Sequence, residues 1–327
     1  QNGFAFALDA APPAPVEDDE EPGVPTTMSL LDVAEAAEKP AISSVAVCAE
    51  PGLALALNVD DDLRALLENP KILKQVHDYK TALHALHAQG INLAGPIDDV
   101  MLLSYALTPT HTTQSLADVA ARHGHAPPAS LTAAAVTVRA LAPALRAHAD
   151  ECQVTRVYTG IDLPLAPVLY RMEQAGVRID KNVLATLSTR FASEIERVGE
   201  RIYELSGERF NINSPKQLGV VLFTHMGLPA PVKYGKGKSV STAQDVLEQL
   251  AEKHEVPRLV LEYRHLSKLK STYIDQLPNM ADADSRVHTT FQAAATATGR
   301  LSSVNPNLQN IPIRTELGRE IRAAFTS

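Results

Sequence analysis

The chain has 327 residues, of which 45% are hydrophobic and 21% are charged, and it contains two cysteines. This length allows two or three domains with sizeable cores, and the composition is that of an ordinary soluble protein. No apolar run approaches the roughly 20 residues of a membrane-spanning helix, and no secretory signal opens the chain. We therefore expect a cytoplasmic protein with no membrane partner, in which Cys48 and Cys152 are buried thiols.

The net charge of −8, taken as a whole, argues against a protein that binds nucleic acid. The charge is uneven, however. Residues 201–327 carry 16 Lys and Arg against 12 Asp and Glu, whereas residues 1–200 carry 14 against 26. The phosphates of a nucleic acid would therefore be met by the C-terminal part of the chain.

Residues 1–40 are rich in Ala, Pro and acids, with the run VEDDEEPGVP at Val16–Pro25. Such a segment buries too little apolar surface to offset the entropy lost on ordering. We predict an acidic linker over residues 1–40, with a structured arm as the alternative. The chain opens on Gln1 in place of Met, and we expect it to be truncated at this end.

Residues 41–160 combine strand and helix patterns. Two runs rich in Val, Ala and Leu, at 42–50 and 52–59, meet at Pro51-Gly52 and predict a β-hairpin or adjacent strands. Helical patterns follow at 61–69, 72–90, 98–107 and 131–149, and acids stand at two of the expected helix starts. Strands followed by helices predict an α/β or α+β domain.

Residues 161–285 are mainly helical. After Asp180, which suits an N-cap, apolar residues recur at steps of three and four until Gly207 ends the pattern. A second long helix is predicted at about Pro257–Leu277, and two shorter helices lead to it. Two long helices joined by a smaller helical tip would form a thumb-like projection.

Four polar clusters carry the functional hypotheses, and the first lies at Phe210–Leu218. Ser214 and Gln217 form a capping box, with Pro215 at the first helical position. The free amides of this helix start would hold an anion, beside three further donors, Asn211, Asn213 and Lys216. A plain capped helix is the alternative.

The second cluster, at Val232–Leu250, places three lysines in a Gly-containing loop, Lys233, Lys236 and Lys238. Thr242 is expected to head the next helix, with Asp245 as its capping partner. A basic loop that leads into a capped helix can follow phosphates without reading the base sequence. A solvated surface loop is the alternative.

The third cluster lies on the helix predicted at about Pro257–Leu277. At 100° per residue, four polar side chains fall within about 100° of one another, namely Arg264, Lys268, Ser271 and Thr272. Apolar residues occupy the other side. The helix should therefore pack one face and present a basic, hydroxyl-bearing face, which could also be an ordinary solvated face.

The fourth cluster runs from Arg286 to Arg322. RVHTTFQAAATATGRLSS alternates hydroxyls, small residues and β-formers, a pattern that predicts paired strands. TATGRLSSVNPNLQNIP, at Thr296–Pro312, adds one Arg and a run of carboxamides. These groups suit base edges and the oxygens of a sugar-phosphate backbone, although a polar loop can have the same composition.

The string ATGRLSS-x-NPNLQNIPIR resembles the segment that opens the palm of family A DNA polymerases, the bacterial DNA polymerase I type. YRHLSKLKSTY, at 263–273, is similar to a thumb motif of that family, and residues 41–160 resemble its proofreading domain. The resemblance implies a multi-domain α+β fold. An α/β, ribonuclease H-like exonuclease-type domain at 41–160 would precede a mainly helical thumb at 161–285 and the first strands of a palm at 286–327.

The same resemblance implies contacts with DNA. Arg300 would reach into the minor groove at the primer terminus, where every correct base pair presents acceptors at N3 and O2. The carboxamides after it would hold template and primer, and the thumb clusters would contact the duplex. The implied DNA-binding residues are Asn211, Asn213, Ser214, Lys216, Lys236, Lys238, Ser241, Thr242, Arg264, Lys268, Ser271, Thr272, His288, Arg300, Asn305, Asn307, Gln309 and Asn310.

Family A polymerases join nucleotides by a two-metal mechanism. The resemblance places the metal-binding carboxylates in a DYSQIELR-like strand and an HDE-like turn, both expected beyond Ser327. We expect the full-length product to be a monomeric DNA-directed DNA polymerase of replication and repair. It would use Mg²⁺, primer-template DNA and deoxynucleoside triphosphates. No catalytic or metal-binding residue is assigned within the chain, which alone is predicted to lack polymerase activity.

The proofreading domain of the family carries an Asp-x-Glu pair on its first strand and further Asp residues. Here the strand expected to be the first, at 43–50, has no Asp-x-Glu, and Ala82 stands where an Asp is expected, two residues after Lys80. Asp150 and Glu151 are at most a partial remnant. The resemblance therefore predicts a degenerate domain that lacks 3′–5′ exonuclease activity and is retained as a scaffold.

An alternative of another class stays open, namely a stand-alone module that binds duplex DNA without catalysis. The flanking reading frame separates the two hypotheses, because a DYSQIELR-like strand after Ser327 would exclude the stand-alone module.

Overall fold

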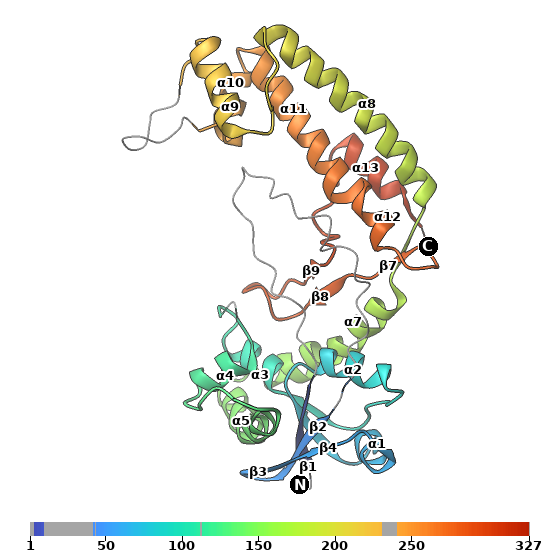
Figure 1. Cartoon of the computed structure of the whole chain (residues 1–327). Coiled ribbons are helices and arrows are strands. Elements are labelled where there is room, and N and C mark those ends of the chain that lie inside the picture. Colours follow the sequence, from blue (N-terminus) through green and yellow to red (C-terminus); the bar gives the residue numbers. More distant parts are fainter. Residues whose placement is uncertain (1–2, 10–41, 43, 112, 231–240, 327) are drawn as a thin grey trace. The chain divides into compact units, whose positions relative to one another are not determined.

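The computed structural model describes residues 3–9, 42, 44–111, 113–230 and 241–326 (Figure 1). They form two compact units, each of which is described by itself. The first unit holds the described residues up to Gly176 together with Thr289–Gln309, and the second holds Val177–His288 together with residues 310–326.

A five-stranded sheet in the order β3-β2-β1-β4-β5 forms the centre of the first unit. β1 pairs antiparallel with β2 and parallel with β4, and β4 pairs parallel with β5. β2 and β3 form the predicted hairpin about Pro51-Gly52. The strands are β1 (Gly3–Leu8), β2 (Val45–Glu50), β3 (Leu53–Leu57), β4 (Leu73–Val76) and β5 (Ile97–Asp99).

The central strand β1 shows that the prediction of a linker over residues 1–40 is wrong at its start. Phe4 and Phe6 of β1 belong to one buried apolar cluster, whereas Ala5 belongs to another. Because successive side chains of a strand point to opposite faces, β1 is buried on both sides of the sheet. The apolar surface that β1 buries offsets the entropy lost on ordering this segment, although the residues after it are acidic and rich in Pro. Residues 10–40 of the predicted linker lie outside the described residues.

Helices cover both faces of this sheet. α5 packs with α3 against Ala5 and Ala46, whose small side chains allow a close approach, and α1 and α2 pack against Phe4 and Phe6. The helices of the unit are α1 (Asp61–Glu68), α2 (Tyr79–Ala88), α3 (Val100–Leu107), α4 (Leu116–Arg122), α5 (Leu131–Glu151), α6 (Thr155–Val157), the π-helical turn η1 (Tyr158–Asp162) and α7 (Leu163–Ala175).

Three further expectations for this unit are corrected. The helix predicted across 72–90 is strand β4 followed by α2. The strand was not predicted because it contains polar residues. One of them, Lys74, is buried, and its Nζ donates to the carbonyl oxygens of Asn69 and Ala94. Cys48 is a buried thiol as predicted, but Cys152 is exposed. The unit also extends past residue 160, where a domain boundary was predicted, because α7 packs against α2 and η1.

The first unit ends with a separate antiparallel pair, β8 (Thr290–Gln292) and β9 (Ser302–Val304). The pattern of hydroxyls and β-formers predicted such paired strands. β8 lies against α7, so this late segment of the chain belongs to the same compact unit as the five-stranded sheet.

In the second unit, the long helices α8 (Lys181–Ser206) and α11 (Glu255–Leu269) lie side by side and run in opposite directions (Figure 1). Asp180 caps α8 as predicted, because its Oδ1 accepts the N–H groups of Asn182 and Val183 at 2.9 and 3.2 Å. Gly207 ends the helix with φ of 79°. In chain order, α8 is followed by α9 (Pro215–Val220), the π-helical turn η2 (Val221–His225) and α10 (Gln244–Ala251), which precede α11.

The second unit continues with the π-helical turn η3 (Lys270–Ile274) and α12 (Gln276–Met280). A three-stranded sheet joins β6 (Val177–Ile179) to β10 (Phe325–Thr326) on one side and to β7 (Arg286–Val287) on the other. α13 (Glu316–Ala323) packs on α8, where Glu320 pairs with Arg190 at 2.6 Å. Within the described ranges, every helix is too short or too polar to span a membrane.

Candidate nucleic-acid interface

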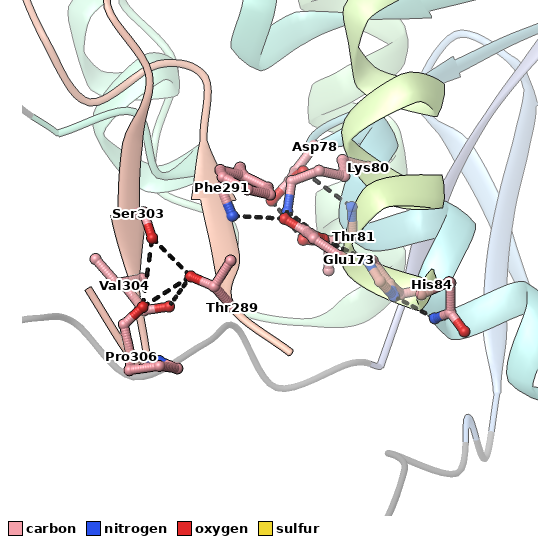
Figure 2. Close-up of polar contacts among 11 residues, drawn as sticks. Asp78, Lys80, Thr81, His84, Glu173, Thr289, Phe291, Ser303, Val304 and Pro306 are labelled. Carbon is pink, nitrogen blue, oxygen red and sulfur yellow. Dashed lines mark hydrogen bonds and ion pairs between the residues drawn. The ribbon is translucent and has the colours of Figure 1, made fainter. Parts of the chain in front are cut away.

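A cluster of hydroxyl groups fixes the β8–β9 hairpin. Phe291 lies opposite Ser303 in the antiparallel register. Thr289 is buried, and its Oγ1 lies 2.7 Å from Ser303 Oγ and 2.8 and 3.0 Å from the carbonyl oxygens of Pro306 and Val304 (Figure 2). One side chain thus ties the start of β8 to the end of β9 and to the segment after it.

The loop between β8 and β9 presents Arg300. Thr296 Oγ1 donates to the carbonyl oxygen of Arg300 at 2.7 Å, and Gly299 has φ of 76°, where a side chain would be strained. The hydroxyl of Tyr105, a buried residue of α3, donates to the carbonyl oxygen of Thr296 at 2.7 Å. Arg300 is exposed. The hydrogen bond from Tyr105 connects its loop to α3.

The predicted carboxamides follow β9. Asn305 and Gln309 are exposed, whereas Asn307 is half-buried. Asn305 has φ of 52° and precedes a cis peptide bond to Pro306. The Oδ1 of Asn307 accepts the backbone N–H of Gln309 at 3.1 Å, which is the geometry of an Asx turn. Asn307 therefore shapes the segment, while Asn305 and Gln309 present their amides to solvent.

A buried carboxylate joins β8 to the helices of the first unit. Glu173 of α7 is 6% exposed. Its oxygens accept from Lys80 Nζ at 2.8 and 3.0 Å, and one of them also accepts the backbone N–H of Phe291 at 2.6 Å (Figure 2). The other lies 2.5 Å from Nε2 of His84. Burial alone would raise the pKa of Glu173, but the bonds from His84, Lys80 and Phe291 hold it below its usual value.

The sequence patterns singled out Lys80 but not its partner, Glu173. Glu173 belongs to no motif, and a Glu on a helix is normally exposed. A signal was present, however. The buried positions of α7 are Ala166, Leu169 and Glu173, which follow one helical face at steps of three and four. A charged residue on the apolar stripe of a helix indicates a buried partner.

The first polar cluster of the second unit is the predicted capped helix start. Ser214 Oγ accepts the N–H of Gln217 at 3.4 Å, and Gln217 Oε1 accepts the N–H of Asn211 at 2.8 Å. Asn211 Oδ1 in turn accepts the N–H of Asn213 at 3.0 Å. Asn211, Asn213 and Lys216 are exposed. The geometry accounts for the capping residues, and the anion site at this six-residue helix stays a prediction.

The predicted cap of α10 is wrong. The helix follows Ala243 without a side-chain cap, and Thr242 is buried at 4% exposure. Thr242 instead meets Arg264 of α11. Nη1 of Arg264 donates to the carbonyl oxygen of Thr242 at 2.8 Å, and Nη2 donates to its hydroxyl at 3.4 Å. Two side chains predicted to contact DNA are therefore bonded to each other, and burial lowers the pKa of the Arg264 guanidinium.

The rest of the third cluster is exposed as predicted. Lys268, Ser271 and Thr272 are solvent-accessible, whereas the buried residues of α11 and η3 are all apolar. Because η3 is a π-helical turn, Ser271 and Thr272 depart from the 100° spacing used to place them. His288 is exposed, with its Nε2 3.0 Å from Asp282 Oδ2.

The predicted contacts are divided between the two units. The first unit holds four of them, Arg300, Asn305, Asn307 and Gln309. Lys236 and Lys238 lie outside the described residues. All the others, including the exposed residues Ser241 and Asn310, belong to the second unit.

The acids expected of a nuclease are absent from the two strands that open the first unit. β1 reads GFAFAL and precedes β2 in the chain, so the expectation that the strand at 43–50 is the first strand is wrong. Neither β1 nor β2 contains Asp-x-Glu. Ala82 is buried in α2. Asp98 is paired with Arg146. Among the residues that the structure describes, no three His, Cys, Asp or Glu side chains are grouped so that they could hold a metal ion.

Asp99 has a structural role at the start of α3. It is fully buried, and its oxygens accept the N–H groups of Tyr79 and Met101, both at 2.8 Å. Burial raises the pKa of Asp99 to about 7, and the charge of Asp78 adds to the shift, while the backbone N–H groups oppose it. Asp99 thus caps α3 and ties the start of α2 to it.

The chain is similar to known proteins in sequence and in structure. Residues 181–327 match the family described as DNA polymerase family A, and residues 53–129 match the domain described as DNA polymerase I, ribonuclease H-like domain. The DNA polymerase I of Bacillus subtilis (strain 168) is 39% identical over 282 residues, which cover 79% of this chain and 32% of that protein. The thermostable DNA polymerase I of Thermus aquaticus is 45% identical over 243 residues, which cover 72% and 28%.

A solved structure, the POL domain of Pol1 from M. smegmatis in complex with DNA primer-template and dNTP, is 34% identical with a TM-score of 0.78. The match covers 88% of this chain and 52% of that chain. The chain belongs to DNA polymerase family A. It spans about a third of the length of the curated relatives that it matches. The multi-domain α+β class with a ribonuclease H-like domain is confirmed. The matched residues 53–129 lie within β1–β5 and α1–α7, which we call the ribonuclease H-like body.

Proposed function

We propose that this chain is the part of a DNA-directed DNA polymerase that holds primed DNA. It would comprise the ribonuclease H-like body, the thumb and the entrance of the palm. The observation that carries the proposal is the β8–β9 hairpin, where Arg300 and Asn305 stand exposed on a framework fixed by Thr289. The relative solved with primer-template DNA, which covers 88% of this chain, supports it.

The residue types suit two kinds of contact. Lys216, Lys268 and the hydroxyls of Ser271 and Thr272 would bind backbone phosphates, which needs no information about base identity. Arg300 would donate to the N3 and O2 acceptors of the minor groove, which all four correct base pairs present. Both kinds of contact would hold a primer of any sequence.

The proposed chemistry needs two Mg²⁺ ions held by carboxylates. From Arg286 to Ser327 the only acidic residues are Glu316 and Glu320, and both lie on α13. Glu320 is also paired with Arg190. We therefore propose that the Mg²⁺ ligands and the site for deoxynucleoside triphosphates belong to other parts of the full-length enzyme, and that residues 1–327 bind primed DNA without extending it.

Incubation of the chain with a labelled primer-template, Mg²⁺ and the four deoxynucleoside triphosphates tests this proposal. A shift of the DNA in a binding assay without any longer primer is the expected result, and primer extension in proportion to protein would contradict it. A stand-alone module that binds duplex DNA predicts the same outcome. The flanking reading frame separates the two.

We also propose that the ribonuclease H-like body lacks 3′–5′ exonuclease activity. The absence of Asp-x-Glu in β1 and β2 supports this, as does the use of Asp98 and Asp99 in bonds within the protein. A single strand labelled at its 5′ end should keep its length in Mg²⁺, and stepwise shortening from the 3′ end would contradict the proposal. A monomeric state and a cytoplasmic location stay predictions.

A further inference from the structure

Glu173 connects segments of the first unit that are far apart in the sequence. It lies on α7, while Lys80 and His84 lie on α2 and Phe291 lies on β8. The backbone N–H of Phe291 on β8 therefore donates to a side chain of α7, that of Glu173. A hydrogen bond to a carboxylate is roughly twice as strong as one between neutral groups, so the bond from Phe291 to Glu173 should stabilise the position of β8.

The carboxylate itself cannot turn away from β8 easily. Lys80 Nζ contacts both of its oxygens, and His84 is held on its other side, because Gln174 Nε2 lies 2.9 Å from His84 Nδ1. Glu173 is buried, so an oxygen that lost these partners would keep its charge without water. The position of the oxygen that accepts from Phe291 is thus fixed from α2 and α7.

Contacts within the hairpin connect β8 to the segment that carries the predicted DNA contacts. Phe291 is paired with β9 at Ser303, and Thr289 ties β8 to the carbonyl oxygens of Val304 and Pro306. A shift of β8 would therefore move the segment that carries Asn305 and the residues after it.

We propose that Glu173 is a positioning residue for the DNA-contacting segment 289–309. By binding the Phe291 N–H, it anchors β8 to the ribonuclease H-like body and so sets where the hairpin presents Arg300 and the carboxamides. The inference rests on the proposed function. It gives the body a part in holding the primer terminus that requires no nuclease chemistry.

Three variants of the whole chain test this inference. Glu173→Ala removes the acceptor of the Phe291 N–H. Glu68→Ala is the matched control, because Glu68 Oε1 also accepts a backbone N–H, that of Asn92, at 2.8 Å in the same unit. The double variant with Lys80→Met and Glu173→Gln keeps an acceptor for Phe291 and leaves no buried charge unpaired, so it should rescue binding if the acceptor is what matters.

Two measurements are made on each variant. Hydrogen exchange, measured without DNA, should become about tenfold faster or more at Phe291 in Glu173→Ala, because a bond to a charged group is lost. Exchange in α5, which packs on the sheet of the same unit, should stay unchanged, which excludes unfolding of the first unit. Fluorescence anisotropy with a primer-template should show binding about fivefold or more weaker in Glu173→Ala. Glu68→Ala and the double variant should stay within about twofold of the unaltered chain.

The outcomes are distinguishable. Faster exchange at 289–305 with unchanged DNA affinity would overturn the inference and leave the proposed function standing. Unchanged exchange at Phe291 would overturn it as well. An unaltered chain that does not bind primed DNA would overturn the proposed function and the inference together. If Glu173→Ala does not fold, the double variant decides, because weak binding by that variant with native exchange in α5 would contradict an acceptor role.

Discussion

At the scale of single residues, several polar side chains serve the fold as well as a proposed surface. Arg264 and Lys268 lie one turn apart on α11, but only Lys268 is exposed. The guanidinium of Arg264 is bonded to Thr242. A resemblance assigns both residues one role, whereas the structure gives them different environments, so substitutions at the two positions should have different effects.

Lys268→Ala should weaken the binding of primed DNA by the same factor for unrelated base sequences. Its loss should reduce the slope of log K against log salt by about one unit, because one phosphate contact is removed. The free energy of unfolding should be unchanged. Anisotropy titrations at several salt concentrations measure the slope. An unchanged slope would count against the exposed face of α11 as a contact surface.

Arg264→Ala should lower the free energy of unfolding by about 1 to 3 kcal/mol, because the buried Thr242 loses its donor. Urea unfolding followed by circular dichroism measures the change, with Lys268→Ala as the control on the same helix. A loss of DNA affinity in Arg264→Ala without any loss of stability would contradict the structural role given to this residue.

Asp99 predicts a dependence of stability on pH. Its ordinary pKa is 3.8, and burial raises it to about 7 in the folded chain. The folded state thus binds this proton more tightly, so the contribution of Asp99 to stability is complete below about pH 4 and is lost as the pH rises to about 7. The free energy of unfolding should fall across this window by roughly a few kcal/mol.

Urea unfolding at pH 4.5, 6 and 7.5 tests this prediction, with tyrosine fluorescence as the signal because the chain has no Trp. Asp99→Asn should reduce the pH dependence across the window, since Asn does not titrate. The two slopes are compared, because Asn also changes the bond with Tyr79 by an amount that is independent of pH. Equal slopes in the two proteins would contradict the raised pKa.

At the scale of elements, local signals predicted helices well and strands less well. α8 was predicted from Asp180 to Gly207 because its caps and apolar spacing are contained in one segment. β1 and β4 were missed because their burial depends on partners elsewhere in the chain, and because Lys74 gives β4 a polar character. Sequence patterns report local preference, and a central strand is defined by its neighbours.

The caps of α8 and α10 give a paired prediction. Asp180→Ala should destabilise the second unit by about 1 kcal/mol, because two N–H groups of α8 lose their acceptor. Asp245→Ala should change the free energy of unfolding by no more than about 0.5 kcal/mol, because the predicted capping bond at α10 does not exist. Urea unfolding compares the two variants. Equal losses would contradict the assigned helix starts.

At the scale of the whole molecule, the sequence identified the family and the contact segments, but not how they are held. The palm motif placed Arg300 and Asn305 in one polar segment, and the structure exposes both. Glu173, Tyr105 and Thr289 hold that segment, yet they belong to no common motif. Their contacts join positions as far as 191 residues apart, which no local pattern can reveal.

A hydrogen-exchange footprint of the whole chain, recorded with and without a primer-template, shows whether the exposed polar segments bind primed DNA. We expect slower exchange in two places: residues 296–310, and the start of α9 together with residues 264–272 of the second unit. The same protection should appear with two unrelated base sequences and should fade as salt is raised. Protection confined to other surfaces, or no protection at DNA concentrations that saturate binding, would contradict the proposed DNA-binding function.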